Sequence, residues 1–379
     1  MKILFLVYHG LSNYSGISKK ILLQVKGLKE NGHEIVLCTY IVKENGQRHR
    51  MINNRTLENM GTGIVAKIKK RCCYGSILNY IKEEQMDLVY VRSFHNANPF
   101  TIHLFRQIKR MGIKAVMEIP TYPYDSEYVG ADWRVQFNLI IDKLYREKLA
   151  KQMSAIVTFS DKEMIFGQRT IRISNGIDFS SLPLRKKQKG KTSDGAIHLI
   201  GVAEVHYWHG YDRLIHGLGE YYQSPHNKDV YFHIVGGVAP SEMYDTPQAP
   251  GFDGHIKKYD IENYIIFHGQ QYGERLDELF NEADFAIGSL ARHRTGIDKI
   301  KTLKNREYAA RGIPFIYSET DEDFDAMPYI LKASADESPI SINDILQFYK
   351  KTSFSPEEIR DSIKNLTWKK QMEKVINEL

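Results

Sequence analysis

The sequence predicts an α/β protein made of two doubly wound domains, each organised around a parallel sheet. Short apolar runs rich in Val and Ile alternate with amphipathic helical patterns along both halves of the chain. Near-continuous apolar runs are typical of parallel strands that helices cover on both faces. The length of 379 residues exceeds that of one ordinary core and favours two domains of about 150–200 residues each.

Six apolar runs in the first half predict strands, with helical patterns between them. The chain begins "MKILFLVYHG", an apolar stretch too short to span a membrane and without a small-residue cleavage site, so we interpret it as a strand and not as a signal peptide. One helical pattern covers 17–31, and Gly32 stands where such a helix should end. The predicted strands are 2–9, 33–40, 87–93, 114–120, 154–160 and 170–176.

A polar segment without periodicity, "RKKQKGKTSDGA" at 185–196, predicts a linker between domains 1–184 and 197–355. Residues 356–379 end in an amphipathic pattern and are expected to pack back on the first domain. Two such domains imply a cleft between them, and doubly wound sheets bind ligands outside the carboxyl ends of their strands. The strands predicted in the second domain are 197–203, 230–237, 264–270, 284–290 and 314–319.

The chain is mildly basic, with a net charge of +6 and a pI of about 8.9. Basic residues gather at 66–72, 105–114 and 144–151, either as ordinary solvated helix faces or as a surface that rests on anionic lipid. Aromatic residues do not interleave with these runs as stacking platforms, so nucleic acid is not an expected partner. The three cysteines show neither metal-ligand spacing nor a disulfide framework, which fits a reducing cytoplasm.

The stretch "LKNREYAARGIPFI" at 303–316 places Lys304, Arg306 and Glu307 in the first turns of a predicted helix. A helix start offers N–H groups to an anion such as a diphosphate, and neighbouring cations could neutralise its charge. The carboxylate of Glu307 would suit ribose or sugar hydroxyls. The alternative is an acid that is favourable at a helix start, together with surface ion pairs, and the spacing alone does not decide between the two.

The part "NREYAARGIPFI" (305–316) resembles the signature of GT-B-fold glycosyltransferases related to family 4, the glycosyl transferases group 1. Glu307, Gly312 and Pro314 fall in register with that signature. The resemblance implies the GT-B fold, in which two Rossmann-like domains face a central cleft, and a contact between Glu307 and the ribose of a nucleotide sugar. Further motifs follow the family order over nearly the whole chain, namely "GHEIVLCTY" (32–40), "SNGIDF" (174–179), "WHGYDRLIHGL" (208–218), "FHIVGG" (232–237) and "IFHGQQ" (266–271).

The sequence departs from the family pattern at three positions. Lys299 occupies the position of a second Glu, and His209 and Glu204 stand where the phosphate-binding loop usually has Lys and Arg. This variation resembles a subgroup of capsular and surface polysaccharide transferases. We therefore expect the cations that hold the diphosphate among His209, His293, Arg294, Lys304 and Arg306.

Other positions expected near the donor or the acceptor lie in loops that follow predicted strands or at helix starts. The expected donor contacts are Gly16, Gly210, Gly236, His268, Gly269 and Leu303. Glycine at 16 would let a ligand approach the backbone closely at a helix N-terminus. The loop "EIPTYPYDSEY" (118–128) is stiffened by two prolines, and its expected sugar or acceptor contacts are Glu118, Tyr122, Tyr124 and Asp125.

The resemblance implies a hexosyltransferase that moves a sugar from a nucleotide diphosphate donor, a uridine diphosphate sugar, to a glycan or lipid-linked oligosaccharide. It also implies retention of the anomeric configuration. No metal cofactor is expected, because a helix dipole and cations take its place. A role in surface polysaccharide assembly would place the protein in the cytoplasm, as a peripheral protein at the inner face of the membrane.

Three alternatives remain open. Asp321, Asp323 and Asp325 superficially resemble the metal-binding Asp-x-Asp motif of the other large transferase fold. A sugar-nucleotide epimerase on the same fold would change a donor sugar with no acceptor present. A non-catalytic sugar-nucleotide-binding subunit is suggested by the residues at normally catalytic positions, Lys299, Glu204 and His209.

Overall fold

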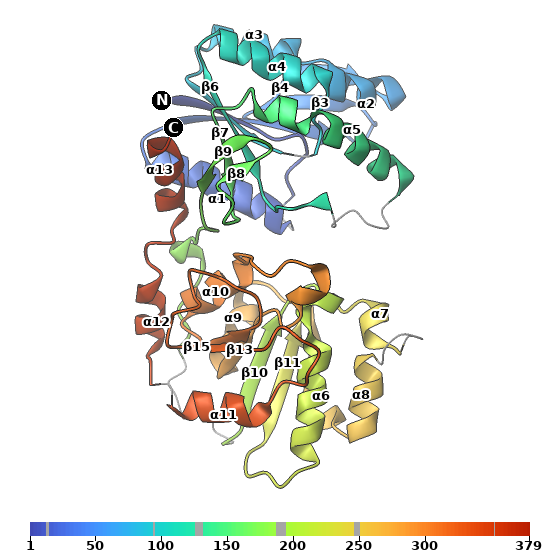
Figure 1. The fold of residues 1–379 in the computed structure, drawn as a ribbon, viewed down its shortest axis with the longest axis vertical. Coiled ribbons are helices and arrows are strands. Elements are labelled where there is room, and N and C mark those ends of the chain that lie inside the picture. The colour runs from blue at the N-terminus through green and yellow to red at the C-terminus, as the bar shows by residue number, and fades with distance from the viewer. Residues whose placement is uncertain (13–14, 94, 126–131, 187–194, 246–250, 352) are drawn as a thin grey trace. The chain divides into compact units, whose positions relative to one another are not determined.

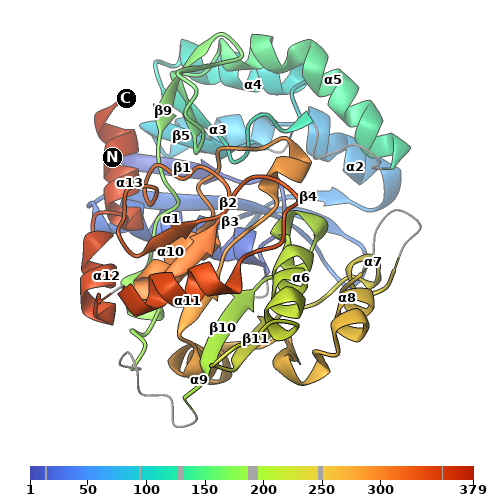
Figure 2. The same cartoon turned by 60° about the horizontal axis from the view of Figure 1, so that its bottom comes forward.

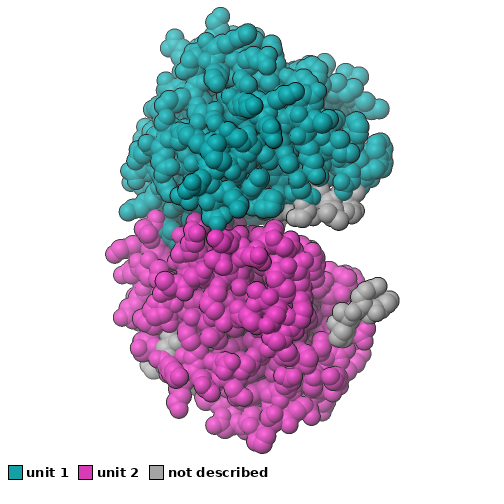
Figure 3. Space-filling model, in the orientation of Figure 1, with its two compact units in different colours: residues 1–176, 366–379 teal, residues 177–365 magenta. Residues whose placement is uncertain are grey.

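The computed structural model describes residues 1–12, 15–93, 95–125, 132–186, 195–245, 251–351 and 353–379. The chain divides into two compact units (Figure 3): unit 1 comprises Met1–Gly176 and Leu366–Leu379, and unit 2 comprises Ile177–Asn365. The chain therefore enters unit 2 after Gly176, ahead of the predicted boundary at 184. Most of the predicted linker 185–196 lies outside the described residues.

Unit 1 is built on a sheet of nine strands, and its central part is parallel as the apolar runs predict. The strands are β1 Lys2–Leu6, β2 Glu34–Val42, β3 Arg48–Ile52, β4 Arg55–Gly61, β5 Leu88–Arg92, β6 Lys114–Ile119, β7 Ala155–Thr158, β8 Met164–Ile165 and β9 Gln168–Arg172. Their order is β4-β3-β2-β1-β5-β6-β7-β9-β8. The edge strands β4 and β8 and the next strand β3 pair antiparallel with their neighbours, whereas the strands from β2 to β9 pair in parallel.

Helices cover both faces of this sheet. They are α1 Gly16–Glu30, α2 Gly63–Cys72, α3 Gly75–Glu83, α4 Pro99–Arg110, α5 Trp133–Ala150 and α13 Trp368–Asn377. Figure 1 shows α1 and α13 on one face and α3, α4 and α5 on the other, and two core clusters fill these layers. In β1, Leu4 and Leu6 belong to one cluster, while Ile3 and Phe5 belong to the other. Burial on both faces explains why this strand shows no polar alternation.

The C-terminal helix α13 belongs to unit 1 and packs against α1. Trp368, its first residue, lies where glycines leave room: a Cβ built on Gly27 would come within 2.7 Å of the Trp368 backbone, and one on Gly176 within 2.5 Å of its indole. Asn31 at the end of α1 also donates from Nδ2 to the carbonyl oxygen of Lys369 (2.8 Å). The first part of the segment 356–379 does not pack on unit 1 as predicted, because helix α12 (Pro356–Ser362) belongs to unit 2.

The close approach of Trp368 leads to a stability prediction for Gly27→Ala. Replacing a glycine by alanine inside a helix normally stabilises the helix by about 1 kcal/mol. Here, however, the added methyl group would overlap the Trp368 backbone. We expect Gly27→Ala to destabilise unit 1 by about 1–3 kcal/mol in urea unfolding. Gly16→Ala is the matched control, because Gly16 lies in the same helix with open space around its Cβ position. Equal midpoints for the two variants would contradict this packing.

Unit 2 is built on a sheet of six parallel strands. They are β10 Ile197–Val202, β11 Val230–Val235, β12 Ile265–Gly269, β13 Phe285–Ile287, β14 Phe315–Tyr317 and β15 Ile330–Lys332. Their order is β12-β11-β10-β13-β14-β15, with parallel pairing throughout. The five strands predicted in this half are confirmed, and β15 adds a sixth.

The helices of unit 2 connect these strands and cover the sheet (Figure 2). They are α6 Tyr211–Tyr222, α7 Pro240–Met243, α8 Phe252–Tyr259, α9 Gly273–Glu282, α10 Leu303–Arg311, α11 Ile342–Lys351 and α12, with the 3₁₀ turns η2 Phe179–Ser181, η3 Tyr207–His209, η4 Glu262–Tyr264 and η5 Arg292–Thr295. Side chains of α6, α8 and α11 share one apolar cluster with the strands. Within the described ranges, no helix combines the length and apolar character needed to cross a membrane.

Candidate functional site

The strand order of unit 2 reverses at β10, which is where doubly wound sheets bind ligands. The chain runs from β10 to β11 and β12 on one side and then continues with β13 on the other side of β10. Because the strands are parallel, the loops at their carboxyl ends lie at the same edge of the sheet. These loops are 203–210 after β10, 288–302 after β13 and 318–321 after β14.

Gly210 brings the loops after β10 and β13 into contact. Its φ of +64° is in the left-handed region, and a Cβ built there would lie 2.8 Å from the Cβ of Ala291. The N–H of Leu290 donates to the carbonyl oxygen of His209 across the same contact (2.9 Å). Only glycine allows this approach without strain, and the result is that His209 lies beside the loop that carries Arg292.

The N-terminus of α10 is fixed at this edge by its cap and by Tyr308. The side chain of Thr302 caps the helix by accepting from the N–H of Asn305 (3.4 Å). The hydroxyl of Tyr308 donates to the carbonyl oxygen of Ile287 in β13 (3.0 Å) and accepts from the N–H of Val202 in β10 (3.1 Å). The first turn of α10, whose leading N–H groups have no partner within the helix, therefore lies at the strand ends, where a helix start can bind an anion.

Arg306 has a structural role here instead of the predicted phosphate contact. Its side chain is 1% exposed, and Nη1 and Nη2 donate to the two carboxylate oxygens of Asp321 at 2.6 and 3.0 Å. Asp323 and the carbonyl oxygen of Thr302 accept further bonds from the same guanidinium. Arg306 thereby ties the start of α10 to the segment after β14. Asp321 and Asp323, two members of the possible Asp-x-Asp motif, are engaged in these ion pairs.

Four ionisable side chains lie together at this edge: His209, Arg292, Lys304 and Glu319, which we call the strand-end cluster. Lys304 and His209 both contact Tyr211, the first residue of α6. The Nζ atom of Lys304 is 3.4 Å from the Tyr211 hydroxyl, and the rings of His209 and Tyr211 have centroids 5.8 Å apart. Arg292 follows β13 and Glu319 follows β14, so the cluster draws on three neighbouring strands.

Burial and mutual charge shift the pKa values of this cluster. Burial, and then the positive charge of Arg292, lower the pKa of Lys304 to about 7. Burial raises the pKa of Glu319 to about 7, although Arg292 and Lys304 oppose the shift. Burial, Lys304 and Arg292 hold the pKa of His209 far below its ordinary value, and its Nδ1 accepts from the N–H of His206 (3.0 Å). His209 is thus a neutral ring that carries its proton on Nε2, beside cations that an anionic ligand would stabilise.

Three buried polar atoms near the cluster have no hydrogen-bond partner among the described residues. They are Oγ of Ser289, Oδ1 of Asn305 and Oε2 of Glu319. All three side chains are less than 3% exposed. Such atoms are normally paired with protein, ordered water or a ligand. They lie where β13 and β14 end and α10 begins, so this edge offers buried polar atoms that a ligand or water could pair with.

Glu307 lies in the second turn of α10 and is partly exposed. Its Oε1 accepts from Nε of Arg311 (3.2 Å), whose Nη1 donates to Asp277 in α9 (2.6 Å). This arrangement holds the carboxylate on the α9 side of the helix. A ribose contact remains a prediction for this residue.

His293 and Arg294 are engaged in ion pairs that hold the loop after β13 against neighbouring segments. Arg294 donates from Nη2 to Asp212 of α6 (2.7 Å) and from Nε to Glu337 (3.0 Å). The Nε2 atom of His293 lies 2.7 Å from Oε1 of the same Glu337. The hydrogen bond from Arg294 is the largest cause that lowers the pKa of Glu337 to about 2. In the structure these two side chains are engaged in ion pairs within unit 2, and their diphosphate contacts remain predictions.

The other predicted donor positions shape the ends of neighbouring elements. Gly236 has a φ of +127°, and a Cβ there would lie 1.7 Å from the carbonyl oxygen of Ala203. Its N–H donates to the carbonyl oxygen of Gly269 (2.7 Å), which joins the ends of β11 and β12. The ring of His268 lies within hydrogen-bonding distance of His233, 2.9 Å between nitrogens. Two candidates start helices: Leu303 begins α10, and Gly16 begins α1 in unit 1.

Two of the four predicted acceptor residues in unit 1 are buried and hydrogen-bonded to other residues of the unit. Glu118 is fully buried and accepts from Arg92 and from the hydroxyl of Tyr90, both at 2.5 Å. The hydroxyl of Tyr124 donates to Asp142 (2.6 Å) and its ring is 3% exposed. These contacts give Glu118 and Tyr124 structural roles instead of the predicted acceptor contacts.

The remaining two acceptor candidates are partly exposed. Tyr122 packs edge-on against Phe166, with ring centroids 5.6 Å apart. Asp125 accepts from Nη1 of Arg146 (2.8 Å) and lies 3.5 Å from Nζ of Lys143. Of the predicted acceptor loop 118–128, residues 126–128 lie outside the described residues. An acceptor contact remains a prediction for Tyr122 and Asp125, both of which are partly exposed.

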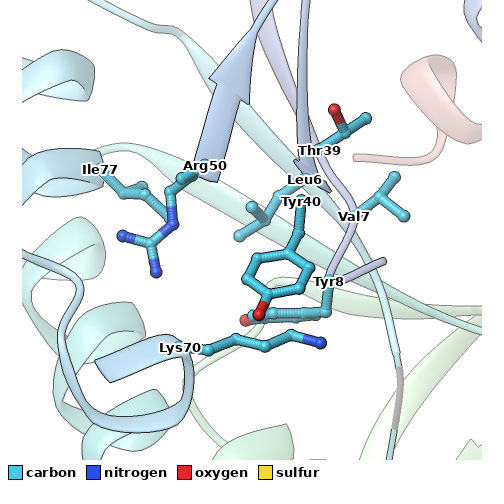
Figure 4. Close-up of a pocket in the computed structure, with 8 residues that line it drawn as sticks. All are labelled: Leu6, Val7, Tyr8, Thr39, Tyr40, Arg50, Lys70 and Ile77. Carbon is cyan, nitrogen blue, oxygen red and sulfur yellow. The ribbon is translucent and has the colours of Figure 1, made fainter. Parts of the chain in front are cut away.

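A small pocket opens in unit 1 beyond the end of β1 (Figure 4). It has room for about one water molecule. Lys70 runs along it with Nζ 4.1 Å from the centre of the Tyr40 ring, and burial lowers the pKa of Lys70 to about 8. The lining residues are Leu6, Val7, Tyr8, Thr39, Tyr40, Arg50, Lys70 and Ile77. This pocket is too small for a sugar, so we do not assign the acceptor to it.

Sequence reasoning missed several residues of the site. Arg292 lies two positions before Arg294 in "SLARHR", and nothing in the spacing distinguishes the two. Glu319, Ser289 and Asn305 were also missed. The rule that ligands bind beyond strand ends points to both residues: Glu319 is the last residue of the predicted strand 314–319, and Ser289 is the second-last residue of the predicted strand 284–290. Asn305 could be found only from the packing of α10.

Comparisons with known proteins identify the fold. The chain matches no protein-family profile and no curated protein sequence. Among solved structures it is similar to a sucrose-phosphate synthase from Thermosynechococcus elongatus (TM-score 0.63, 14% identity, 100% of this chain and 97% of that one). It is also similar to a glycosyltransferase from Rickettsia africae (TM-score 0.59, 14% identity, 100% of this chain and 97% of that one). A third similar structure is WaaG, a glycosyltransferase involved in lipopolysaccharide biosynthesis (TM-score 0.57, 14% identity, 100% of this chain and 99% of that one). The chain therefore has the GT-B fold that the sequence motifs imply.

Proposed function

We propose that the protein is a glycosyltransferase that takes a nucleotide diphosphate sugar in unit 2. The observation that carries this proposal is the strand-end cluster, in which Arg292 and Lys304 adjoin the N-terminus of α10 at the point where the strand order reverses. Cations, free helix N–H groups and a neutral His209 donor together suit a diphosphate. Structural neighbours support the same class: one is a starch synthase domain bound to ADP, and another is TarM in complex with UDP.

We assign the parts of the donor to separate residues. Lys304, Arg292 and the first turn of α10 hold the diphosphate, and His209 donates from Nε2. Glu307 holds the ribose hydroxyls, and backbone groups after β12, around Gly269, hold the base. We propose uracil as the base. Arg306, His293 and Arg294 hold these elements in place without touching the donor.

The reaction transfers the sugar from the diphosphate to an acceptor hydroxyl. The bond between the anomeric carbon and the diphosphate oxygen breaks, and the acceptor oxygen forms a new bond to that carbon. The acceptor proton passes to the departing diphosphate, and attack from the face that the diphosphate leaves retains the configuration. Lys304 and Arg292 stabilise the negative charge that develops on the leaving group, so we propose that no metal ion is required.

For the acceptor we propose a glycan or lipid-linked oligosaccharide in surface polysaccharide assembly, held by unit 1. Tyr122 and Asp125 are the candidates with access for it, since both are partly exposed. The protein would work in the cytoplasm, at the inner face of the membrane. This part of the proposal rests on the sequence resemblance and on the basic helices of unit 1.

Thermal unfolding with a panel of nucleotides tests the donor site. A ligand that binds only the folded state raises stability by about 2.7 kcal/mol at a hundredfold excess over its dissociation constant. We expect uridine diphosphate to raise the melting temperature, and Glu307→Ala to reduce that rise without changing the melting temperature of the free protein by more than a few degrees. Glu278→Ala is the matched control, since Glu278 is an exposed helical glutamate of unit 2 that pairs with Arg275.

The panel also separates the alternatives. A rise in melting temperature with guanosine diphosphate alone would mean that the same site binds a guanosine diphosphate sugar. A shift with uridine diphosphate but no sugar transfer to any acceptor would favour a non-catalytic binding subunit. No shift with any nucleotide, from folded protein, would contradict the proposed donor site.

A further inference from the structure

Helix α5 of unit 1 presents an apolar stripe to solvent. Trp133, Phe137, Ile140 and Leu144 recur at helical spacing and so lie on one side of the helix. Their exposed fractions are 69%, 57%, 56% and 67%. The opposite side of α5 packs on the core through Leu139. Exposure of four large apolar side chains in a row is unusual for a protein surface that has no partner.

Helix α2 has the same character and more positive charge. Ile64, Val65 and Ile68 are 74%, 63% and 55% exposed, and Ala66 is the buried residue of the helix. None of its ten residues is acidic. Its basic residues are Lys67, Lys69, Lys70 and Arg71.

The two helices are neighbours. Arg71 of α2 donates from Nη1 to Oδ1 of Asn138 in α5, and both ribbon views show the helices near each other (Figures 1 and 2). Ile68 lies one turn before Arg71, and Phe137 precedes Asn138, so each stripe reaches this contact. We call the combined surface the α2–α5 face. It consists of Ile64, Val65, Ile68, Trp133, Phe137, Ile140 and Leu144, with the exposed Lys67, Lys69 and Arg71 of α2 and with Arg134 and Lys148 of α5.

We propose that the α2–α5 face docks on the anionic surface of a lipid bilayer. Exposed apolar side chains, a tryptophan and flanking Lys and Arg are the features by which helices lie in a membrane interface. Each basic residue near the surface adds attraction to anionic headgroups. The charge argues against a second copy of this chain as the partner, because two basic α2–α5 faces would repel each other. This proposal deepens the proposed function, on which it rests for the idea that the acceptor is carried by lipid.

Vesicle sedimentation tests the docking without any turnover. The full chain is mixed with vesicles of phosphatidylglycerol and phosphatidylcholine, or of phosphatidylcholine alone. We expect sedimentation with the anionic vesicles, a blue shift of Trp133 fluorescence that Trp133→Phe removes, and release when NaCl is raised from about 0.05 M to about 0.5 M. Phe137→Ser with Ile140→Ser should lower the partition coefficient about tenfold or more.

Met164→Ser with Leu22→Ser provides the matched control. These residues are 56% and 47% exposed in unit 1 but lie outside the α2–α5 face, so the control should bind vesicles like the parent chain. Equal binding by the two double variants, or no binding to anionic vesicles, would overturn the proposal. The proposal would also be overturned if the parent chain were a dimer in sedimentation velocity and the Phe137→Ser/Ile140→Ser variant were a monomer. Failure here leaves nucleotide binding in unit 2 unaffected, so it is distinct from failure of the proposed function.

Discussion

Arg306→Met should unfold unit 2 at a much lower urea concentration than the parent chain requires. The substitution leaves Asp321, which is fully buried, without its bidentate partner. Removing one member of a buried ion pair costs about 3–5 kcal/mol, because the remaining charge stays buried without compensation. Burial alone would lower the pKa of Arg306, yet Asp321 and Asp323 raise it above its ordinary value. The urea midpoint, followed by circular dichroism, measures the effect.

Two further variants make this prediction specific. Arg306→Met with Asp321→Asn should recover part of the loss, because the asparagine is neutral and leaves no buried charge. Arg275→Met breaks an exposed ion pair with Glu278, whose side chains are 52% and 59% exposed, and should change stability by less than about 1 kcal/mol. If Arg306→Met unfolded like the parent chain but no longer bound nucleotide, Arg306 would be a donor contact and its structural assignment would be wrong.

Lys304→Gln should weaken binding of a uridine diphosphate sugar about ten- to hundredfold. A hydrogen bond between an ammonium and a phosphate contributes about 1.5–3 kcal/mol. The variant should unfold no earlier than the parent chain, because burial and Arg292 lower the pKa of Lys304 to about 7 and so make its charge unfavourable in the folded chain. Lys257→Gln is the control, since Lys257 is an exposed lysine of unit 2 that pairs only with Asp253 among the contacts described for it. Isothermal titration calorimetry measures the dissociation constants.

The pH dependence of binding follows from the same lysine. A bound diphosphate favours the charged form and raises the pKa of Lys304, so binding takes up a proton above pH 7 and weakens as the pH rises. Glu319 acts in the same direction, because it gains negative charge above its pKa of about 7. We expect the affinity to fall about three- to tenfold per pH unit between about pH 7 and pH 8.5. A flat profile for the parent chain would contradict contact between Lys304 and the diphosphate.

The fold could be predicted from the sequence because its central strands are apolar on both faces. β1, β5 and β6 of unit 1 and β10 and β11 of unit 2 fall within predicted strands. The hairpin of β3 and β4 was missed, because its edge strands are polar and show no apolar run. The pair Asn53-Asn54 could have predicted the turn, because asparagine tolerates the positive φ that tight hairpin turns require. In the structure the two φ angles are +43° and +70°.

The candidate site could be predicted only in part from the sequence, and donor binding there remains a prediction. The helix start at 303–307 lies where the sequence places it, and Lys304 and His209 both belong to the strand-end cluster. Spacing could not separate Lys304 from Arg306, although they lie two residues apart. Their environments differ because Arg306 points to the acidic segment after β14, while Lys304 contacts Tyr211. Such a distinction depends on tertiary packing, which local pattern does not contain.

Hydrogen–deuterium exchange with and without uridine diphosphate tests whether a donor binds at the strand ends of unit 2. We expect slower exchange in three segments, namely 203–210, 288–305 and 318–321, which hold the strand ends and the first turn of α10. Lys304→Gln should reduce this protection at the same nucleotide concentration. Protection confined to unit 1, or no change at a saturating concentration of any nucleoside diphosphate, would contradict a donor site at the strand ends of unit 2.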